Sequence, residues 1–113
     1  MGDQRFEISF LLDFYGDLLT DKQREAVDLY YNQDFSLFEI SQHAGITRQG
    51  VRDMIKKSED ELVYLEEKLG LLKKFRTLQK KADDLLKDVE NSDASDEIKD
   101  KISKFAESVR ATI

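Results

Sequence analysis

The residue types best suited to binding chemistry lie on one short stretch near the middle of the 113-residue chain. Arg48, Arg52 and Lys56 stand at i, i+4 and i+8, so a helix here would carry three cations on one face, and the alternative is an ordinary solvated face. Gln49 and Arg52 would suit base edges, because amide and guanidinium groups match the paired donors and acceptors of adenine and guanine. Thr47 and Arg48 would hold phosphates at the start of that helix. The candidate nucleic-acid-binding residues are Thr47, Arg48, Gln49, Arg52, Lys56 and Lys57.

A second basic cluster lies further along the chain, where no acidic residue occurs between Lys68 and Asp83. One interpretation is a charged surface that balances acidic neighbours. The other is a second phosphate-binding stripe beside Phe75, which would suit an RNA that presents its backbone on more than one side. The cluster consists of Lys73, Lys74, Arg76, Lys80 and Lys81.

The sequence contains few residues suited to catalysis. His43 is the only histidine and cysteine is absent, which excludes a two-histidine metal site and a cysteine nucleophile within one chain. We expect His43 to be an exposed polar residue or a minor phosphate contact. The glycines lie at positions 2, 16, 45, 50 and 70, and none belongs to a glycine-rich phosphate loop. We therefore expect no metal site, no cofactor and no enzymatic activity.

The candidate binding residues need a rigid support, and the sequence around them predicts a helix-turn-helix. Ser36 and Glu39 form a capping box that would start its first helix. Gly45 suits the left-handed residue that ends this helix, because glycine adopts positive φ without a steric penalty. Thr47 is the expected cap of the second helix. The expected shared core of the two helices is Ile40, Ala44, Ile46, Val51 and Met54.

Apolar spacing and capping signals predict further helices on both sides of this motif. One extends from about Arg5 to Leu18, and the next begins at the capping box of Thr20 and Gln23. After the motif, apolar residues continue at four- and three-residue steps as far as Gly70, with one polar interruption at Ser58, and two more helices follow. The first helix has an expected core stripe of Phe6, Phe10, Leu11, Phe14, Tyr15 and Leu18.

The composition favours an all-α protein, because the chain contains no proline and 37% of its residues are charged. We expect a helix-turn-helix head at residues 1–60, extended by a long helix. Residues 61–113 are expected to form a C-terminal helical tail that includes a helical hairpin and belongs to the same folding unit.

The charge distribution and the apolar seam bear on location and partners. The net charge is −6, yet residues 36–58 hold four Lys/Arg and two Asp/Glu, which gives +2 for that segment. Every apolar run is interrupted by charge, so we expect no membrane span and a cytoplasmic location. The seam from Leu62 to Leu72 would leave an apolar stripe uncovered, which suggests pairing with another chain, including a homodimer.

Several short motifs in the first part of the chain occur together in a known family. They resemble the YlxM proteins of Gram-positive bacteria over roughly residues 6–70. The helix-turn-helix is also similar to that of sigma-factor region 4, which reads promoter DNA. The sequence departs from YlxM at Gly50, usually alanine, at Arg52, usually an aromatic residue, and at Met54 and Lys57. The matching motifs are Phe14-Tyr15, Leu18-Leu19-Thr20-Asp21-Lys22-Gln23, Leu29-Tyr30-Tyr31, Asp34, Ser36-Leu37, Glu39-Ile40, Gly45-Ile46 and Arg48-Gln49.

The resemblance implies a small helical protein that is encoded beside the gene for the signal recognition particle GTPase and acts in that pathway. It implies binding roles for Arg48, Gln49 and Lys56, whereas the role of Arg52 rests on its chemistry alone. The resulting hypothesis is an accessory or regulatory protein that binds the RNA of the particle, its GTPase, or both. Two alternatives are a sequence-specific DNA-binding transcriptional regulator and a protein-interaction module that acts through its helical tail.

Overall fold

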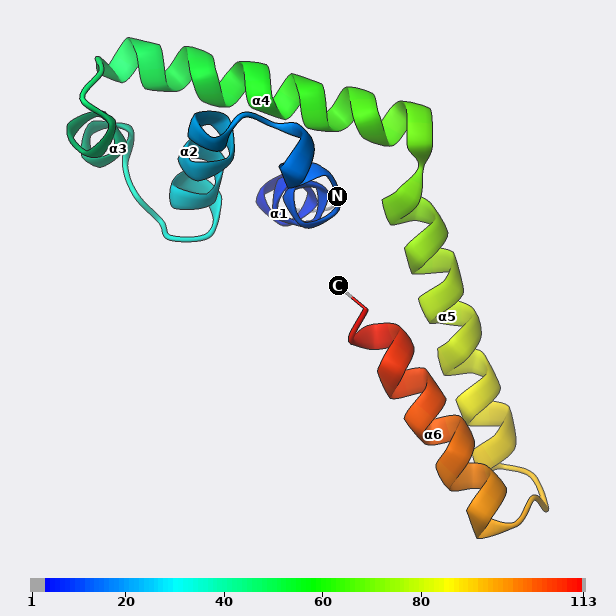
Figure 1. Cartoon of the computed structure of the whole chain (residues 1–113). Helices are drawn as coiled ribbons and strands as arrows, with labels where there is room; N and C mark the ends of the chain where they lie inside the picture. Colours follow the sequence, from blue (N-terminus) through cyan, green and yellow to red (C-terminus); the bar gives the residue numbers. More distant parts are fainter. Residues whose placement is uncertain (1–3, 113) are drawn as a thin grey trace. The chain divides into compact units, whose positions relative to one another are not determined.

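The computed structural model describes residues 4–112, with the side chains of residues 7–112 (Figure 1). All regular elements within this range are helices, which confirms the predicted all-α class with a helix-turn-helix, a long helix and a C-terminal hairpin. None of these helices combines the length and the apolar character that a membrane span requires. The elements are α1 (Gln4–Tyr15), the 3-10 turn η1 (Gly16–Leu18), α2 (Asp21–Tyr31), α3 (Leu37–Ala44), α4 (Arg48–Leu69), α5 (Leu71–Glu90) and α6 (Asp96–Arg110).

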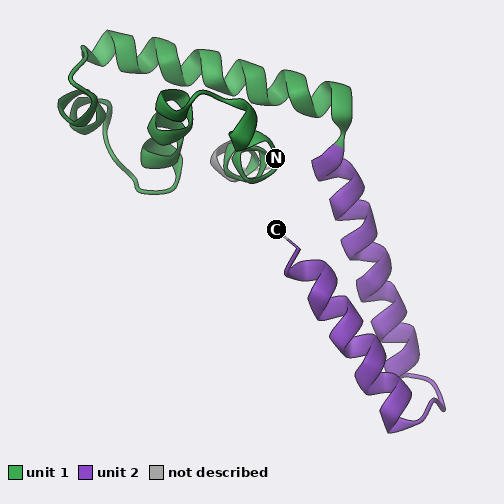
Figure 2. Cartoon of the chain, viewed as in Figure 1, with its two compact units in different colours: residues 1–70 green, residues 71–113 purple. Residues whose placement is uncertain are grey.

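The chain divides into two compact units, Met1–Gly70 and Leu71–Ile113 (Figure 2). The division lies ten residues beyond the expected boundary at residue 60, because α4 continues without a break to Leu69 and all of it belongs to unit 1. Gly70 ends α4 with a φ of 63°, a conformation that favours glycine. That the two units fold together stays a prediction.

In unit 1, α4 lies across α1, α2 and α3 and closes their core (Figure 1). Val51, Ile55 and Leu62 turn from α4 into this core and are at most 4% exposed. Leu62 is thus covered within the chain, and the expectation that the seam from Leu62 onward pairs with another chain is wrong at its first position. A heptad seam looks the same in sequence whether its partner is a neighbouring helix or a second chain.

The buried stripe of α1 differs from the expected one. Phe10 and Leu18 are 38% and 64% exposed, whereas Ile8 and Leu12 are buried in their place. One reason is that α1 ends at Tyr15 and the chain continues as a 3-10 turn, so Leu18 no longer follows the helical direction. The side chain of Phe6 lies outside the described residues. Leu11 and Tyr15 are buried as predicted, and Phe14 is half-buried.

Tyr15 connects α1 to the far half of α4. It is 1% exposed, and its hydroxyl donates a hydrogen bond of 2.7 Å to Oε1 of Glu66. Nearby, Ser58 is fully buried, and its hydroxyl donates to the carbonyl oxygen of Met54 at 2.7 Å. The polar interruption of the seam is therefore a small residue whose hydrogen bond is satisfied inside its own helix.

Unit 2 is an antiparallel hairpin of α5 and α6 (Figure 2). Ala82, Ala106 and Val109 form its small buried core, and Leu86 packs against them. The Ser95 hydroxyl caps α6 by accepting a hydrogen bond from the backbone N–H of Ile98. The core is narrow because two helices can bury only the line along which they touch.

Candidate nucleic-acid interface

The helix-turn-helix in unit 1 is formed by α3, a short turn and α4. The predicted capping box is present, since the Ser36 hydroxyl accepts from the Glu39 N–H at 3.0 Å and the Glu39 carboxylate accepts from the Ser36 N–H at 2.9 Å. These hydrogen bonds lower the pKa of Glu39 below its usual value. Gly45 ends α3 with a φ of 70°, and its N–H donates to the carbonyl of Ser41 at 2.9 Å. The turn that presents α4 is therefore fixed by local hydrogen bonds, as predicted.

The core under the turn is only partly the predicted one. Ile40 and Val51 are buried, and Met54 packs against them. Ala44 is exposed and Ile46 is 40% exposed, so their expected burial is wrong. They flank Gly45 at the surface of the motif, and residues of α2 pack under the helices instead, with Ala26 inside the cluster.

Thr47 caps α4, and its side-chain hydroxyl is engaged in the cap. Its Oγ1 accepts the N–H of Gly50 at 3.0 Å. A Cβ at Gly50 would approach the same oxygen to 3.2 Å, a crowded distance. A phosphate contact at Thr47 would therefore use the backbone of the first turn of α4 and leave the capping hydroxyl in place.

The predicted cationic face is present on the first half of α4. Arg48, Arg52 and Lys56 are all exposed, while Val51 and Ile55 face the core. Arg48 and Arg52 form no ion pair with any of the described residues, so both guanidinium groups are available to a ligand. The predicted exposure of these three cations is confirmed, and their binding role stays a prediction.

Two candidate residues on this face are held by acidic side chains one turn further along α4. Gln49 Nε2 donates to Oδ1 of Asp53 at 2.8 Å, and Lys56 Nζ donates to Oδ1 of Asp60 at 3.0 Å. Asp60 raises the pKa of Lys56 through this hydrogen bond and its charge. Exposed pairs of this kind contribute little to stability, because water and salt screen them. An incoming phosphate or base can therefore displace either carboxylate at small cost.

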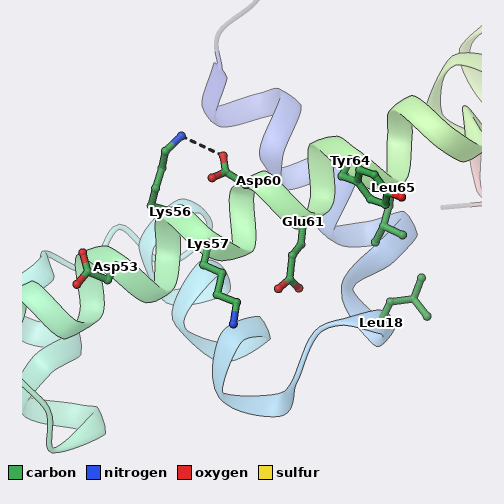
Figure 3. Close-up of a pocket in the computed structure, with 8 residues that line it drawn as sticks. All are labelled: Leu18, Asp53, Lys56, Lys57, Asp60, Glu61, Tyr64 and Leu65. Carbon is green, nitrogen blue, oxygen red and sulfur yellow. Dashed lines mark hydrogen bonds and ion pairs between the residues drawn. The ribbon is translucent and has the colours of Figure 1, made fainter.

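Lys57 points away from Lys56, but both lysines line a shallow groove of about 720 Å³ beside α4 (Figure 3). Lys57 and Glu61 point to one side of the helix, whereas Lys56 and Asp60 point to the other (Figure 3). Tyr64 and the η1 residue Leu18 supply exposed apolar surface to the groove. The groove is not evident from the sequence, because it brings together residues far apart in the chain and the spacing of Leu18 predicts a core position.

The second basic cluster lies on α5 in unit 2, and all five of its side chains are exposed. The helix divides the cluster into two stripes. Lys73, Arg76 and Lys80 follow each other at i, i+3 and i+7, whereas Lys74 and Lys81 are seven residues apart on a different side. The five cations therefore do not form one continuous binding surface.

The surface of α1 and α2 is acidic. The pKa of Asp13 is raised by burial and by the negative charge of Asp28. Arg24 forms ion pairs with Asp17 at 2.8 Å and Asp21 at 3.3 Å. This surface would repel a polyanion and favour approach from the side of Arg48 and Arg52.

His43 is exposed as predicted, but it has a protein partner. Its Nε2 lies 2.6 Å from Oε1 of Glu25, and both side chains are about half exposed (53% and 57%). The pair joins α3 to α2. Glu25 is thus the nearest charged group to His43, which makes a phosphate contact by this histidine less favourable than the sequence suggested.

Comparison with known proteins extends this description. The sequence model of the UPF0122 family of YlxM/p13-like helix-turn-helix proteins matches residues 2–105. A UPF0122 protein of Acetivibrio thermocellus is 50% identical over 93 residues, which cover 82% of this chain and 80% of the relative. Another, from Clostridium kluyveri, is 41% identical over 105 residues, which cover 91% and 95%. A third, from Caldanaerobacter subterraneus, is 53% identical over 81 residues, which cover 72% and 69%.

Proposed function

Because this chain belongs to the UPF0122 family of YlxM/p13-like helix-turn-helix proteins, we propose that it binds nucleic acid as a non-enzymatic accessory protein of the signal recognition particle pathway. The family match confirms the resemblance predicted from the sequence. One observation carries the proposal of nucleic-acid binding. The first half of α4, directly after the helix-turn-helix turn, presents Arg48 and Arg52, which form no ion pair with the described part of the chain, and Lys56 in a weak one.

The contact surface in this proposal is the exposed side of α4 from Thr47 to Lys56. Arg48 and the free N–H groups of the first turn bind a phosphate, supported by the helix dipole. Arg52 reaches a base edge or a second phosphate. Lys56 and Gln49 leave their carboxylate partners and add contacts once the nucleic acid is close. Lys57 contributes only to the local positive potential.

The RNA of the particle is the proposed nucleic acid, with its GTPase as a protein partner and the cytoplasm as the location. These assignments rest on the resemblance to YlxM. The stripe of Lys73, Arg76 and Lys80 on α5 adds support for RNA, since a folded RNA presents phosphates in several directions.

The test is a salt titration of binding to the particle RNA, read by fluorescence anisotropy. Each phosphate contact contributes about 0.7–0.9 to the slope of log K against log salt. We expect Arg48→Ala and Arg52→Ala each to weaken binding and to reduce this slope by about one contact. The matched control is Arg24→Ala, which removes the same charge from the acidic surface and should leave the slope unchanged. Absence of binding by the native chain at low salt would refute the proposal.

A sequence-specific DNA-binding regulator is the second candidate, favoured by the helix-turn-helix geometry itself. The same face of α4 would then enter the major groove. Selection from random duplex DNA separates the two candidates. An enriched motif that Arg52→Ala abolishes would favour DNA, whereas no enrichment together with tight RNA binding would favour the particle RNA.

A further inference from the structure

The hairpin of unit 2 leaves a line of large apolar side chains exposed on each helix. Leu78 and Leu85 of α5 are 51% and 43% exposed, and Ile98 and Phe105 of α6 are 47% and 53% exposed. Each pair is spaced by seven residues, so each forms a continuous line along its helix. Isolated exposed leucines are common, but two such lines on one small hairpin are not explained by its own core.

Both lines face the same side of the hairpin. On α5 the buried Ala82 lies between Leu78 and Leu85, and on α6 the buried residues Ala106 and Val109 follow Phe105. At about 100° per residue, each exposed line is roughly a quarter turn from the direction of the other helix. The rotation has the same sense along the chain in both helices. Because the helices run antiparallel, it brings the two exposed lines to the same face of the hairpin. Unit 2 is thus shaped like half of a four-helix bundle.

The charges beside the α5 line indicate what covers this face. Lys74, Lys81 and Asp88 follow each other at seven-residue steps along one edge of the line. Lys74 and Asp88 form no ion pair with any residue that the structure describes. In an antiparallel pair of identical helices, an edge faces the same edge of the partner, so this edge would place unlike charges opposite each other.

We propose that the α5 side of this exposed face binds the same α5 side of a second copy of this chain. The two α5 helices cross antiparallel near Lys81, with Leu78 beside Leu85 of the partner subunit and Lys74 beside Asp88 of the partner subunit. The contact is isologous, so each pair occurs twice. The two Lys81 side chains approach the axis and extend their charged ends into solvent. This inference concerns unit 2 alone and does not rest on the proposed function.

Sedimentation equilibrium of the full chain over a range of micromolar concentrations tests the pairing. We expect a concentration-dependent dimer, and we expect Leu78→Glu or Leu85→Glu to weaken it by at least about tenfold, because each places a charge in the apolar contact. The control is Phe38→Glu on α3, an apolar residue of similar exposure (54%) in unit 1, which should leave the dimer intact. Circular dichroism checks that each variant keeps its helices. A monomer at every concentration would overturn the proposal.

Charge exchange tests the antiparallel register. Lys74→Glu alone and Asp88→Lys alone each place like charges opposite each other, so each should weaken the dimer, by roughly tenfold at low salt. A mixture of the two variants restores both unlike pairs and should form a heterodimer of nearly native affinity. Failure of the mixture to recover would overturn the register.

Crosslinking gives an independent readout, since the native chain contains no cysteine. Lys81→Cys lies near the proposed axis and should be joined to its partner copy by a short bis-maleimide. Lys74→Cys should not be joined, because its two copies would be separated by ~20 Å along the helices. Faster linking of Lys74→Cys would indicate parallel helices and would contradict the proposal.

Discussion

Replacing Gly50 by alanine has two opposing effects on stability, a gain in helix propensity and a disturbance of the Thr47 cap of α4. Alanine is favoured over glycine in helices by about 1 kcal/mol. The new Cβ would lie 3.2 Å from Thr47 Oγ1, which accepts the Gly50 N–H at 3.0 Å, and 3.6 Å from Ile46 Cδ1. Because Thr47 must shift by a few tenths of an ångström, part of a cap worth about 1 kcal/mol is lost. The expected net effect is a stabilisation of about 0.5 kcal/mol.

The assay is a double-mutant cycle, with unfolding by urea followed by circular dichroism. In a Thr47→Ala background the crowded oxygen is absent, so Gly50→Ala should there contribute its full gain of about 1 kcal/mol. Thr47→Ala alone should cost about 1 kcal/mol. Equal gains in both backgrounds would show that the methyl group does not disturb the cap. A loss of stability in both would refute the reasoning altogether, because it would mean that the backbone requires glycine.

Three further outcomes follow from the packing and charges of unit 1. Ser58→Leu should destabilise the fold by about 1–3 kcal/mol through overpacking, whereas Ser58→Ala should be nearly neutral; urea unfolding measures both. Asp13→Asn should stabilise the protein at neutral pH by less than about 1 kcal/mol, because burial and the negative charge of Asp28 both disfavour the charged form of Asp13. Since the folded pKa of Asp13 is raised above 3.8, the gain should disappear below that pH, where the carboxyl is protonated in both states. Asp60→Asn should release Lys56 and tighten nucleic-acid binding, with a salt slope steeper by up to about 0.9; an unchanged slope would contradict this.

Local signals made most helix boundaries predictable. The two capping boxes that start α2 and α3 and the left-handed Gly45 and Gly70 act within a few residues of the chain, so the sequence contains all the information they need. The register of α1 could not be predicted in the same way. Apolar residues occur on several sides of this helix, and packing against α2 and α4 selects Ile8 and Leu12 over Phe10.

The candidate binding surface was partly predictable for the same reason. The exposure of Arg48, Arg52 and Lys56 follows from helical spacing once Val51 is assigned to the core. The groove beside Tyr64 was not predictable, because it depends on where η1 is placed against α4. The carboxylates that hold Gln49 and Lys56 stand four residues further along the chain, so a search for i, i+4 pairs would have found them.

The separation of core and solvent sides along α4 has a consequence for how such a protein can diverge. In the first half of α4, the buried positions pack in the core, whereas the exposed positions do not contribute to this packing. Relatives can therefore exchange Gln49, Arg52 or Lys57 without repacking Val51 and Ile55. The buried side of α4 keeps the fold, while substitutions on its exposed side can change which ligand is bound. Relatives with the same architecture can therefore differ in ligand preference.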